Sequence, residues 1–187
     1  FELVQRRLQD ANRHALARSQ MLIDASLDAV ITIDSHGHIV GWNAQAEPIF
    51  GYATEDALGQ DMADLIVPPQ HRRAHHAGMQ RYLSTLQPHI LGRRIEVEGM
   101  RADGTVFPME LSIITLEQDG AYFFSAYIRD LTEHKHAQDT LVRSMQLFAK
   151  VFNSSPIAAS IASARNGTFA QINQNFTRDF GYTEDDL

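Results

Sequence analysis

Hydrophobic and polar residues alternate with a period of two in several stretches of this chain, the pattern of half-buried β-strands. The first two stretches flank the turn residues 34–37, which predicts a hairpin. Asp-Gly pairs at 103–104 and 119–120 separate the last three stretches, and Asp-Gly between apolar runs is a strong hairpin signal. We therefore expect five strands, at residues 30–33, 39–42, 93–100, 106–116 and 121–129.

Between the second and third strands the pattern is helical and interrupted. Gly51 is expected to end the first short helix, and Thr54 is expected to be the N-cap of the next. Helices this short need a sheet to pack on, so the element order predicts an α+β fold. We expect a five-stranded antiparallel sheet with short helices on one face. The expected helices cover residues 43–50, 54–58, 62–66 and 70–85.

Both ends of this domain carry longer helical patterns. Residues 1–22 place apolar side chains at alternating steps of four and three, which suits either pairing with another helix or packing on the helix's own domain. Residues 133–150 predict a linker helix whose apolar seam could pair with its counterpart in a homodimer. The apolar positions are Val4, Leu8, Ala11, Ala15 and Leu22 in the first helix, and Leu141, Met145, Phe148 and Phe152 in the second.

One short motif occurs twice. Asn43 is followed seven residues later by Phe-Gly-Tyr at 50–52, and Asn173 is followed seven residues later by Phe-Gly-Tyr at 180–182, an offset of 173 − 43 = 130 residues. Two similar units therefore stand in tandem, the second incomplete, and we expect the chain to be part of a longer protein. The expected organisation is a signalling helix at 1–22, a domain at 23–132, a linker helix at 133–150 and a partial second domain at 151–187.

Composition argues against several classes of function and of metal site. A net charge of −7 argues against nucleic-acid binding, which needs a basic face. The absence of cysteine excludes disulfides, iron–sulfur clusters and thiolate metal sites, and fits a cytoplasmic location. No apolar run approaches the roughly 18 residues that span a membrane. No glycine-rich phosphate loop or nucleophile elbow is present, so we expect no enzyme activity in this section of the protein.

Several motifs together resemble the PAS sensor family, over about residues 21–132. Residues 151–187 resemble the first third of a second PAS unit. The resemblance implies a module that holds a small ligand between helices and sheet, or holds none and dimerises. Its flanking helices would pass a signal to an output domain, either a histidine kinase, a cyclic-di-GMP enzyme or a chemoreceptor. The motifs are Ile39-Val40-Gly41-Trp42-Asn43, Phe50-Gly51-Tyr52, Gly59-Gln60, the run from Arg101 to Pro108, and Arg129-Asp130-Leu131-Thr132.

The helix at 70–85 is similar to the haem-bearing helix of FixL-type and Dos-type oxygen sensors. That similarity places His75 at the axial ligand position of a haem b iron, with Met79 and Tyr82 as further cofactor-binding candidates. The opposing strand has Ile95 where these sensors have an arginine. Arg93 stands where the Dos-type sensor has a methionine ligand, and it could donate to a bound ligand or be a solvated strand residue.

Alternatives to haem remain open at this helix. His75 could simply pack or hydrogen-bond inside the domain. His71 and His75, four residues apart, have the spacing of a zinc pair, but no third ligand is recognisable. At the end of the last strand, Asp130 and Thr132 resemble the family's element that couples sheet to linker helix, and we expect Thr132 to cap that helix.

Overall fold

The computed structural model describes residue 23 and residues 25–87 and 91–183. The chain divides into two compact units, one ending at Thr132 and the other beginning at Glu133. The expected helix at 1–22 lies outside the described residues.

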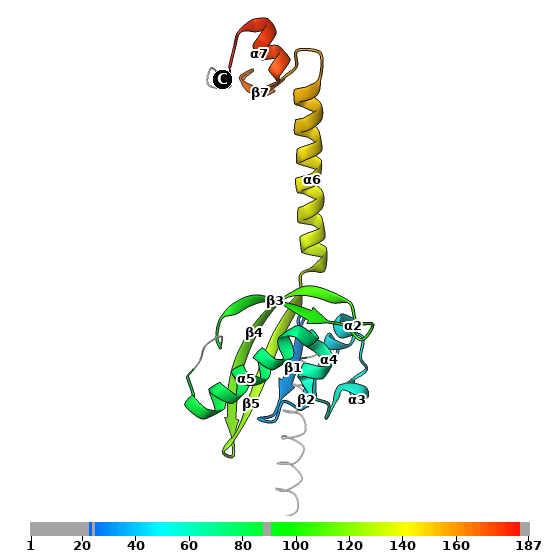
Figure 1. Cartoon of the computed structure of the whole chain (residues 1–187), viewed down its shortest axis with the longest axis vertical. Helices are drawn as coiled ribbons and strands as arrows, with labels where there is room; N and C mark the ends of the chain where they lie inside the picture. Colours follow the sequence, from blue (N-terminus) through cyan, green and yellow to red (C-terminus); the bar gives the residue numbers. More distant parts are fainter. Residues whose placement is uncertain (1–22, 24, 88–90, 184–187) are drawn as a thin grey trace, which may run out of the picture. The chain divides into compact units, whose positions relative to one another are not determined.

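The first unit contains a five-stranded antiparallel sheet in the order β2-β1-β5-β4-β3 (Figure 1), which confirms the predicted fold. Four strands differ slightly in extent from the prediction. The largest difference is in β4, whose pairing with β5 continues to Gln118 and Ala121 at the turn. In that turn Asp119 and Gly120 both have positive φ, as the tight Asp-Gly hairpin requires. The strands are β1 Ala29–Ile33, β2 Ile39–Trp42, β3 Arg94–Met100, β4 Val106–Gln118 and β5 Ala121–Asp130.

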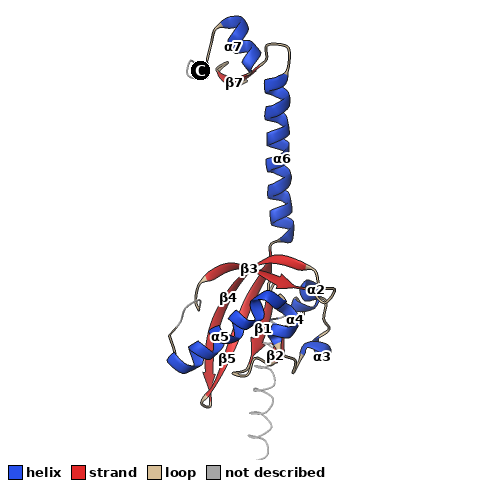
Figure 2. Ribbon diagram, viewed as in Figure 1, coloured by secondary structure: helices blue, strands red, loops and turns tan. Residues whose placement is uncertain are grey.

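Helices α2 to α5 lie over one face of this sheet (Figure 2), and two predicted helix starts need correction. The first helix begins at residue 46, since Asn43 lies before it and its side chain accepts hydrogen bonds from Val30 N and Ala46 N. Thr54 is not an N-cap. Its hydroxyl donates to Glu47 Oε1 at 2.6 Å, and Ala53 takes the cap position. The helices are α2 Ala46–Phe50, α3 Thr54–Ala57, α4 Met62–Ile66 and α5 Pro69–Thr85.

The core lies between α2–α4 and the sheet. Phe50 is fully buried, with its ring centroid 5.6 Å from that of Trp42 and 5.7 Å from that of Phe107. Gly99 on β3 permits this closeness, because a Cβ there would lie 2.8 Å from Met109 Sδ. We name this cluster the closed region. It consists of Ile31, Trp42, Ala46, Phe50, Phe107, Met109 and Ile128, all buried.

The second unit repeats the beginning of the first. Two short strands pair antiparallel and are followed by a helix, in the same order as β1, β2 and α2. The linker helix α6 is longer than the expected 133–150. The elements are α6 Thr132–Ser154, β6 Ser160–Ala162, β7 Phe169–Ile172 and α7 Gln174–Phe180. Within the described ranges, none of the helices combines the length and apolar character that crossing a membrane needs.

Candidate ligand site and relay element

Helix α5 covers the sheet more loosely than α2–α4 do. None of its 17 residues is buried, and the side chains that reach the core are only half-buried. The sheet positions that pack around the core in this part are half-buried as well, although they face the helical layer. We name this set the α5 layer. It consists of Met79, Tyr82 and Leu83 on the helix and Val97, Leu111, Ile113 and Ala126 on the sheet.

His75 differs from the other α5 histidines in its hydrogen bonding, although its ring stands edge-on to that of His76 with centroids 5.8 Å apart. Its Nδ1 atom is buried and has no hydrogen bond to any described residue. Burial, with a smaller effect from neighbouring His76, lowers the pKa of His75 below its ordinary value. The imidazole is therefore neutral at physiological pH, which is the form that binds a metal ion.

The two other histidines of this stretch face carboxylates. His71 Nε2 lies 3.4 Å from Glu98 Oε2 on β3, and both side chains are exposed. His76 Nε2 lies 3.5 Å from Asp61 Oδ2, while Asp61 Oδ1 caps α4 by accepting from Ala63 N. His71 and His76 therefore each have a carboxylate partner, whereas the Nδ1 atom of His75 has none among the described residues.

Tyr82 anchors the second half of α5 to the sheet. Its hydroxyl donates to Thr115 Oγ1 at 3.2 Å, and its ring stands edge-on to Phe124 with centroids 5.5 Å apart. The Met79 methyl lies beside the β1–β2 turn, 3.4 Å from where a Cβ of Gly37 would be. His75, Met79 and Tyr82 thus share one side of α5 at spacings of four and three.

The two cofactor-binding candidates expected on the third strand, Arg93 and Ile95, are placed less favourably for contact with a ligand beneath α5. Ile95 is half-buried on β3 and pairs with Leu111 of the α5 layer. Arg93 lies just before β3, which begins one residue later than expected, and it is exposed. Strand alternation therefore does not place Arg93 on the same face as Ile95, and its role stays a prediction.

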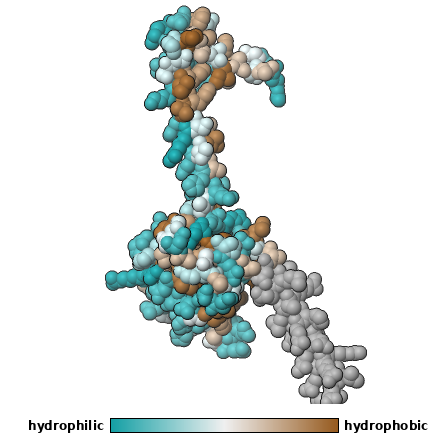
Figure 3. All heavy atoms as spheres, turned by 90° about the vertical axis from the view of Figure 1, so that its right-hand side faces the viewer, coloured by the Kyte–Doolittle hydropathy of each residue, from teal (hydrophilic) through white to brown (hydrophobic). Residues whose placement is uncertain are grey.

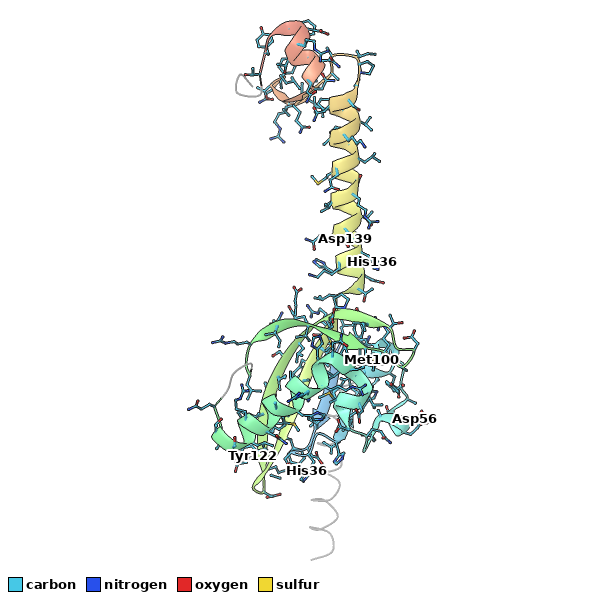
Figure 4. All side chains as sticks on the ribbon, viewed as in Figure 1. His36, Asp56, Met100, Tyr122, His136 and Asp139 are labelled. Atoms are coloured by element: carbon cyan, nitrogen blue, oxygen red, sulfur yellow. The ribbon has the colours of Figure 1, made fainter. Side chains whose placement is uncertain are left out.

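Asp130 and Thr132 form a compact polar cluster where β5 meets α6. Asp130 Oδ1 accepts from Thr132 N at 2.8 Å and from Thr132 Oγ1 at 2.5 Å. The expected cap at Thr132 was therefore wrong: Thr132 is the first helical residue, and Asp130 caps the first turn. Partial burial alone would raise the pKa of Asp130, but hydrogen bonds from Thr132 and Arg101 outweigh it and lower the pKa. The carboxylate is thus charged and held in place. Beyond this cluster His136 and Asp139 project from α6 into solvent (Figure 4).

Arg101 completes this cluster, and its contribution was not predicted from the sequence. We name Arg101, Asp130 and Thr132 the relay cluster, after the coupling role expected of Asp130 and Thr132. Arg101 Nη2 donates to Asp130 Oδ2 at 2.5 Å and to Thr132 Oγ1 at 3.3 Å. Its guanidinium also donates to the Ile49 carbonyl and lies 3.8 Å from the Phe107 ring centroid. Arg101 therefore connects α2 and the closed region to the start of α6. Its place in the motif at the β3–β4 turn was the available signal.

Two hollows lie on the sheet face opposite the helices. The more apolar one, of about 310 Å³, includes Val30, Ile114, Leu116 and Tyr127 in its lining, which alternate with inward-facing core residues. The polar one, of about 200 Å³, contains the Asp28–Arg129 ion pair. Neither hollow belongs to the α5 layer, because the strand residues that line them point away from it.

With this geometry established, the comparisons with known proteins give the family. The family model described as PAS fold matches residues 17–130, more than half of the chain. The chain therefore belongs to the PAS family, whose units are sensory modules rather than catalytic domains.

The curated proteins similar to this chain include a sensor protein and a histidine kinase. The chain is 39% identical over 132 residues to the sensor protein FixL of Bradyrhizobium diazoefficiens, covering 71% of this chain and 25% of that protein. It is 30% identical over 127 residues to the cell-division control histidine kinase PdhS of Brucella ovis, covering 66% and 12%. The chain thus spans about a quarter or less of these relatives' length. It contains a PAS unit of the kind found in sensor histidine kinase-like, two-component proteins.

Solved structures agree on the fold. A PAS domain from Colwellia psychrerythraea matches with a TM-score of 0.54 at 21% identity, covering 64% of this chain and 98% of that one. The PAS domain of an HTR-like protein from Haloarcula marismortui matches with a TM-score of 0.52 at 22% identity, covering 67% and 98%.

Proposed function

We propose that this chain is the sensory region of a bacterial-type signalling protein, and that it binds haem b between α5 and the sheet with His75 as the axial ligand. The observation that carries the proposal is that His75, on a helix with no fully buried residue, has a neutral ring whose Nδ1 atom is buried and lacks a hydrogen-bond partner among the described residues. The 39% identity to FixL, a sensor protein, supports the sensory role.

The residues of the α5 layer fit such a group. A haem needs an apolar environment for its ring and a neutral nitrogen for its iron, which would supply a centre responsive to a gas or to redox state. Val97, Leu111, Ile113 and Ala126 present apolar surface beneath α5. Tyr82 holds α5 to β4 and β5, so that His75 would have a defined height above the sheet.

The signal would leave through the relay cluster. Arg101 joins the Ile49 carbonyl of α2 to Asp130 and Thr132, so a shift of the helical layer alters the bonds that begin α6. From there α6 would lead to the output domain. The PdhS relative favours a histidine kinase over a cyclic-di-GMP enzyme or a chemoreceptor.

An absorption spectrum after incubation with hemin tests the haem proposal. We expect a Soret band that shifts from its free-hemin position in the wild type and in the control variant His71→Ala, but not in His75→Ala. His71 is a suitable control because it lies one turn away on α5 and contacts Glu98. A spectrum of free hemin in the wild type, or an unchanged shifted band in His75→Ala, would refute the role of His75.

A second function, dimerisation through α6, is favoured by its exposed apolar stripe. Leu141, Met145 and Phe148 are 60%, 62% and 50% exposed, positions that a helical partner would cover. Figure 3 shows that the hydrophobic residues at the surface of the second unit gather mainly in the part that follows α6. A homodimer through this stripe would place two output domains side by side.

Sedimentation of the full chain tests the dimer. Phe148→Glu puts a charge in the stripe and should yield monomer at concentrations where the wild type is dimeric. Gln146→Glu, an equal charge change at another exposed α6 position, should leave the dimer intact. Equal behaviour of the two variants would argue against this stripe as the interface.

A further inference from the structure

The side chain of Asn43 forms four hydrogen bonds at the beginning of the first unit. Its Oδ1 accepts from Val30 N at 2.8 Å and from Ala46 N at 3.1 Å, which ties β1 to the start of α2. Its Nδ2 donates to the carbonyls of Ile23 at 3.1 Å and Asp28 at 3.2 Å. The side chain is 2% exposed, so both ends of the amide are satisfied inside the protein.

Asn173 repeats this arrangement in the second unit. Its Oδ1 accepts from Ala159 N and Phe176 N, both at 2.9 Å. Its Nδ2 donates to the carbonyls of Phe152 at 3.0 Å and Ile157 at 2.9 Å. Each partner lies 129 or 130 residues after its counterpart, since 152 − 23 = 129 and 176 − 46 = 130. The side chain is 1% exposed.

The Phe152 bond is the one that reaches into the linker helix. Phe152 belongs to the last turn of α6, where carbonyls lack partners within the helix. The Asn173 amide supplies one. A second amide, that of Asn175, donates to the carbonyl of Ser155 just beyond the helix. The end of α6 is thereby bonded to the junction of β7 and α7.

The two ends of α6 are thus held in a similar way by different units. At the first turn Asp130 accepts from Thr132, and at the last turn Asn173 donates to Phe152. A rotation or shift of α6 would move the Phe152 carbonyl and would displace the Asn173 side chain that donates to it. The Oδ1 atom of the same side chain then carries the displacement to Ala159 and Phe176.

We propose that Asn173 is the positioning residue through which the second PAS unit receives changes carried by α6. The proposal rests on the relay through α6 set out above, but it does not depend on haem. Asn173 would then have two roles. It caps α7, and it bonds the end of α6 to the strands that follow.

The substitution Asn173→Asp separates the two halves of the side chain. Aspartate keeps an oxygen that accepts from Ala159 and Phe176, and it is as good an N-cap as asparagine. It loses the donor to the carbonyls of Phe152 and Ile157. Asn173→Ser, which keeps a capping oxygen but is too short to span both sets of partners, repeats the test should the aspartate variant not fold. Asn166→Asp, in the exposed β6–β7 turn, is the matched control.

Hydrogen exchange of the full chain is the measurement, with Thr132→Ala as the perturbation at the far end of α6. In the wild-type and Asn166→Asp backgrounds we expect Thr132→Ala to speed amide exchange in β6 and β7 by about threefold or more, within the range of coupling between sites. In the Asn173→Asp background that increase should disappear. An equal increase in all three backgrounds would overturn the role of Asn173 alone. No increase in the wild type would overturn the relay through α6 as well.

Discussion

The closed region and the α5 layer cover the same face of one sheet, yet they are filled differently. Phe50, Ile31 and Ile128 are at most 2% exposed under α2–α4, whereas Leu111, Ile113 and Ala126 remain half-exposed near α5. The strands alternate in the same way in both places, so the difference comes from the helices. Helix α2 contributes Ala46, Ile49 and Phe50 to the core, and α5 contributes only half-buried side chains.

This difference separates the part of the unit that is densely packed from the part for which we propose ligand binding. A protein interior is normally packed as densely as an organic crystal, and apolar surface left half-covered forgoes stabilisation of about 25 cal/mol per Å². The α5 layer has this half-covered apolar surface beside His75, whose buried Nδ1 atom has no hydrogen-bond partner among the described residues. A ligand of matching shape would recover the missing burial.

Truncation in the closed region should have the largest effect on stability. Phe50→Ala removes a fully buried ring that contacts Trp42 and Phe107, so we expect the free energy of unfolding to fall by about 3–5 kcal/mol in urea titrations. Leu83→Ala, in the half-buried α5 layer, should lower it by less than about 1.5 kcal/mol. Similar losses for the two variants would remove the distinction between the regions.

Loss of Arg101 should have the second-largest effect on stability. Arg101→Ala leaves Asp130 without its charged donor and frees the Ile49 carbonyl, and hydrogen bonds to charged groups contribute roughly 1.5–3 kcal/mol. We expect a loss of about 2 kcal/mol in the same titrations. The exposed pair of Arg94 and Glu110 provides the control, and Arg94→Ala should change stability by under about 0.5 kcal/mol.

Enlarging an alanine tests the same comparison from the opposite direction. Ala46→Leu inserts three carbons into a site with no exposure, where overpacking destabilises by roughly 1–3 kcal/mol. Ala126→Leu adds the same atoms in the α5 layer, at a position that pairs with Ile113 on one side and with Ile31 of the closed region on the other. This substitution should change the free energy of unfolding by under about 0.5 kcal/mol, or increase it. If Ala126→Leu proves as harmful as Ala46→Leu, the layer is already full.

The smallest expected effect is a pH dependence due to His75. Its pKa in the folded protein lies below the unfolded value of about 6.5, so folding opposes its protonation. The neutral form stabilises the fold fully above pH 6.5, and this contribution declines as the pH falls from there toward the folded pKa. When the pH of the haem-free protein is lowered from 7.5 to 5.5, the urea midpoint should therefore fall less in His75→Leu than in the wild type. Parallel changes in both proteins would contradict the burial of His75.

Much of this architecture could be predicted from local pattern, and the remainder depends on distant contacts. Alternation and the Asp-Gly turns located the five strands, and the Asn-to-Phe-Gly-Tyr repeat located the second unit. The cap at Thr54 was wrong because Glu47, seven residues away, takes its hydroxyl. Arg101 was missed because its partners at 49, 130 and 132 meet only in the folded sheet.

Hemin affinity of Ala126→Leu compared with the wild type tests the central claim most directly, because the substitution adds atoms beneath α5 and leaves His75 intact. If the α5 layer is the haem site, the added leucine occupies space that the ring needs. The dissociation constant should then rise by at least about tenfold, equivalent to roughly 1.4 kcal/mol, in a titration followed at the Soret band. An unchanged affinity in a folded Ala126→Leu protein would show that hemin binds elsewhere.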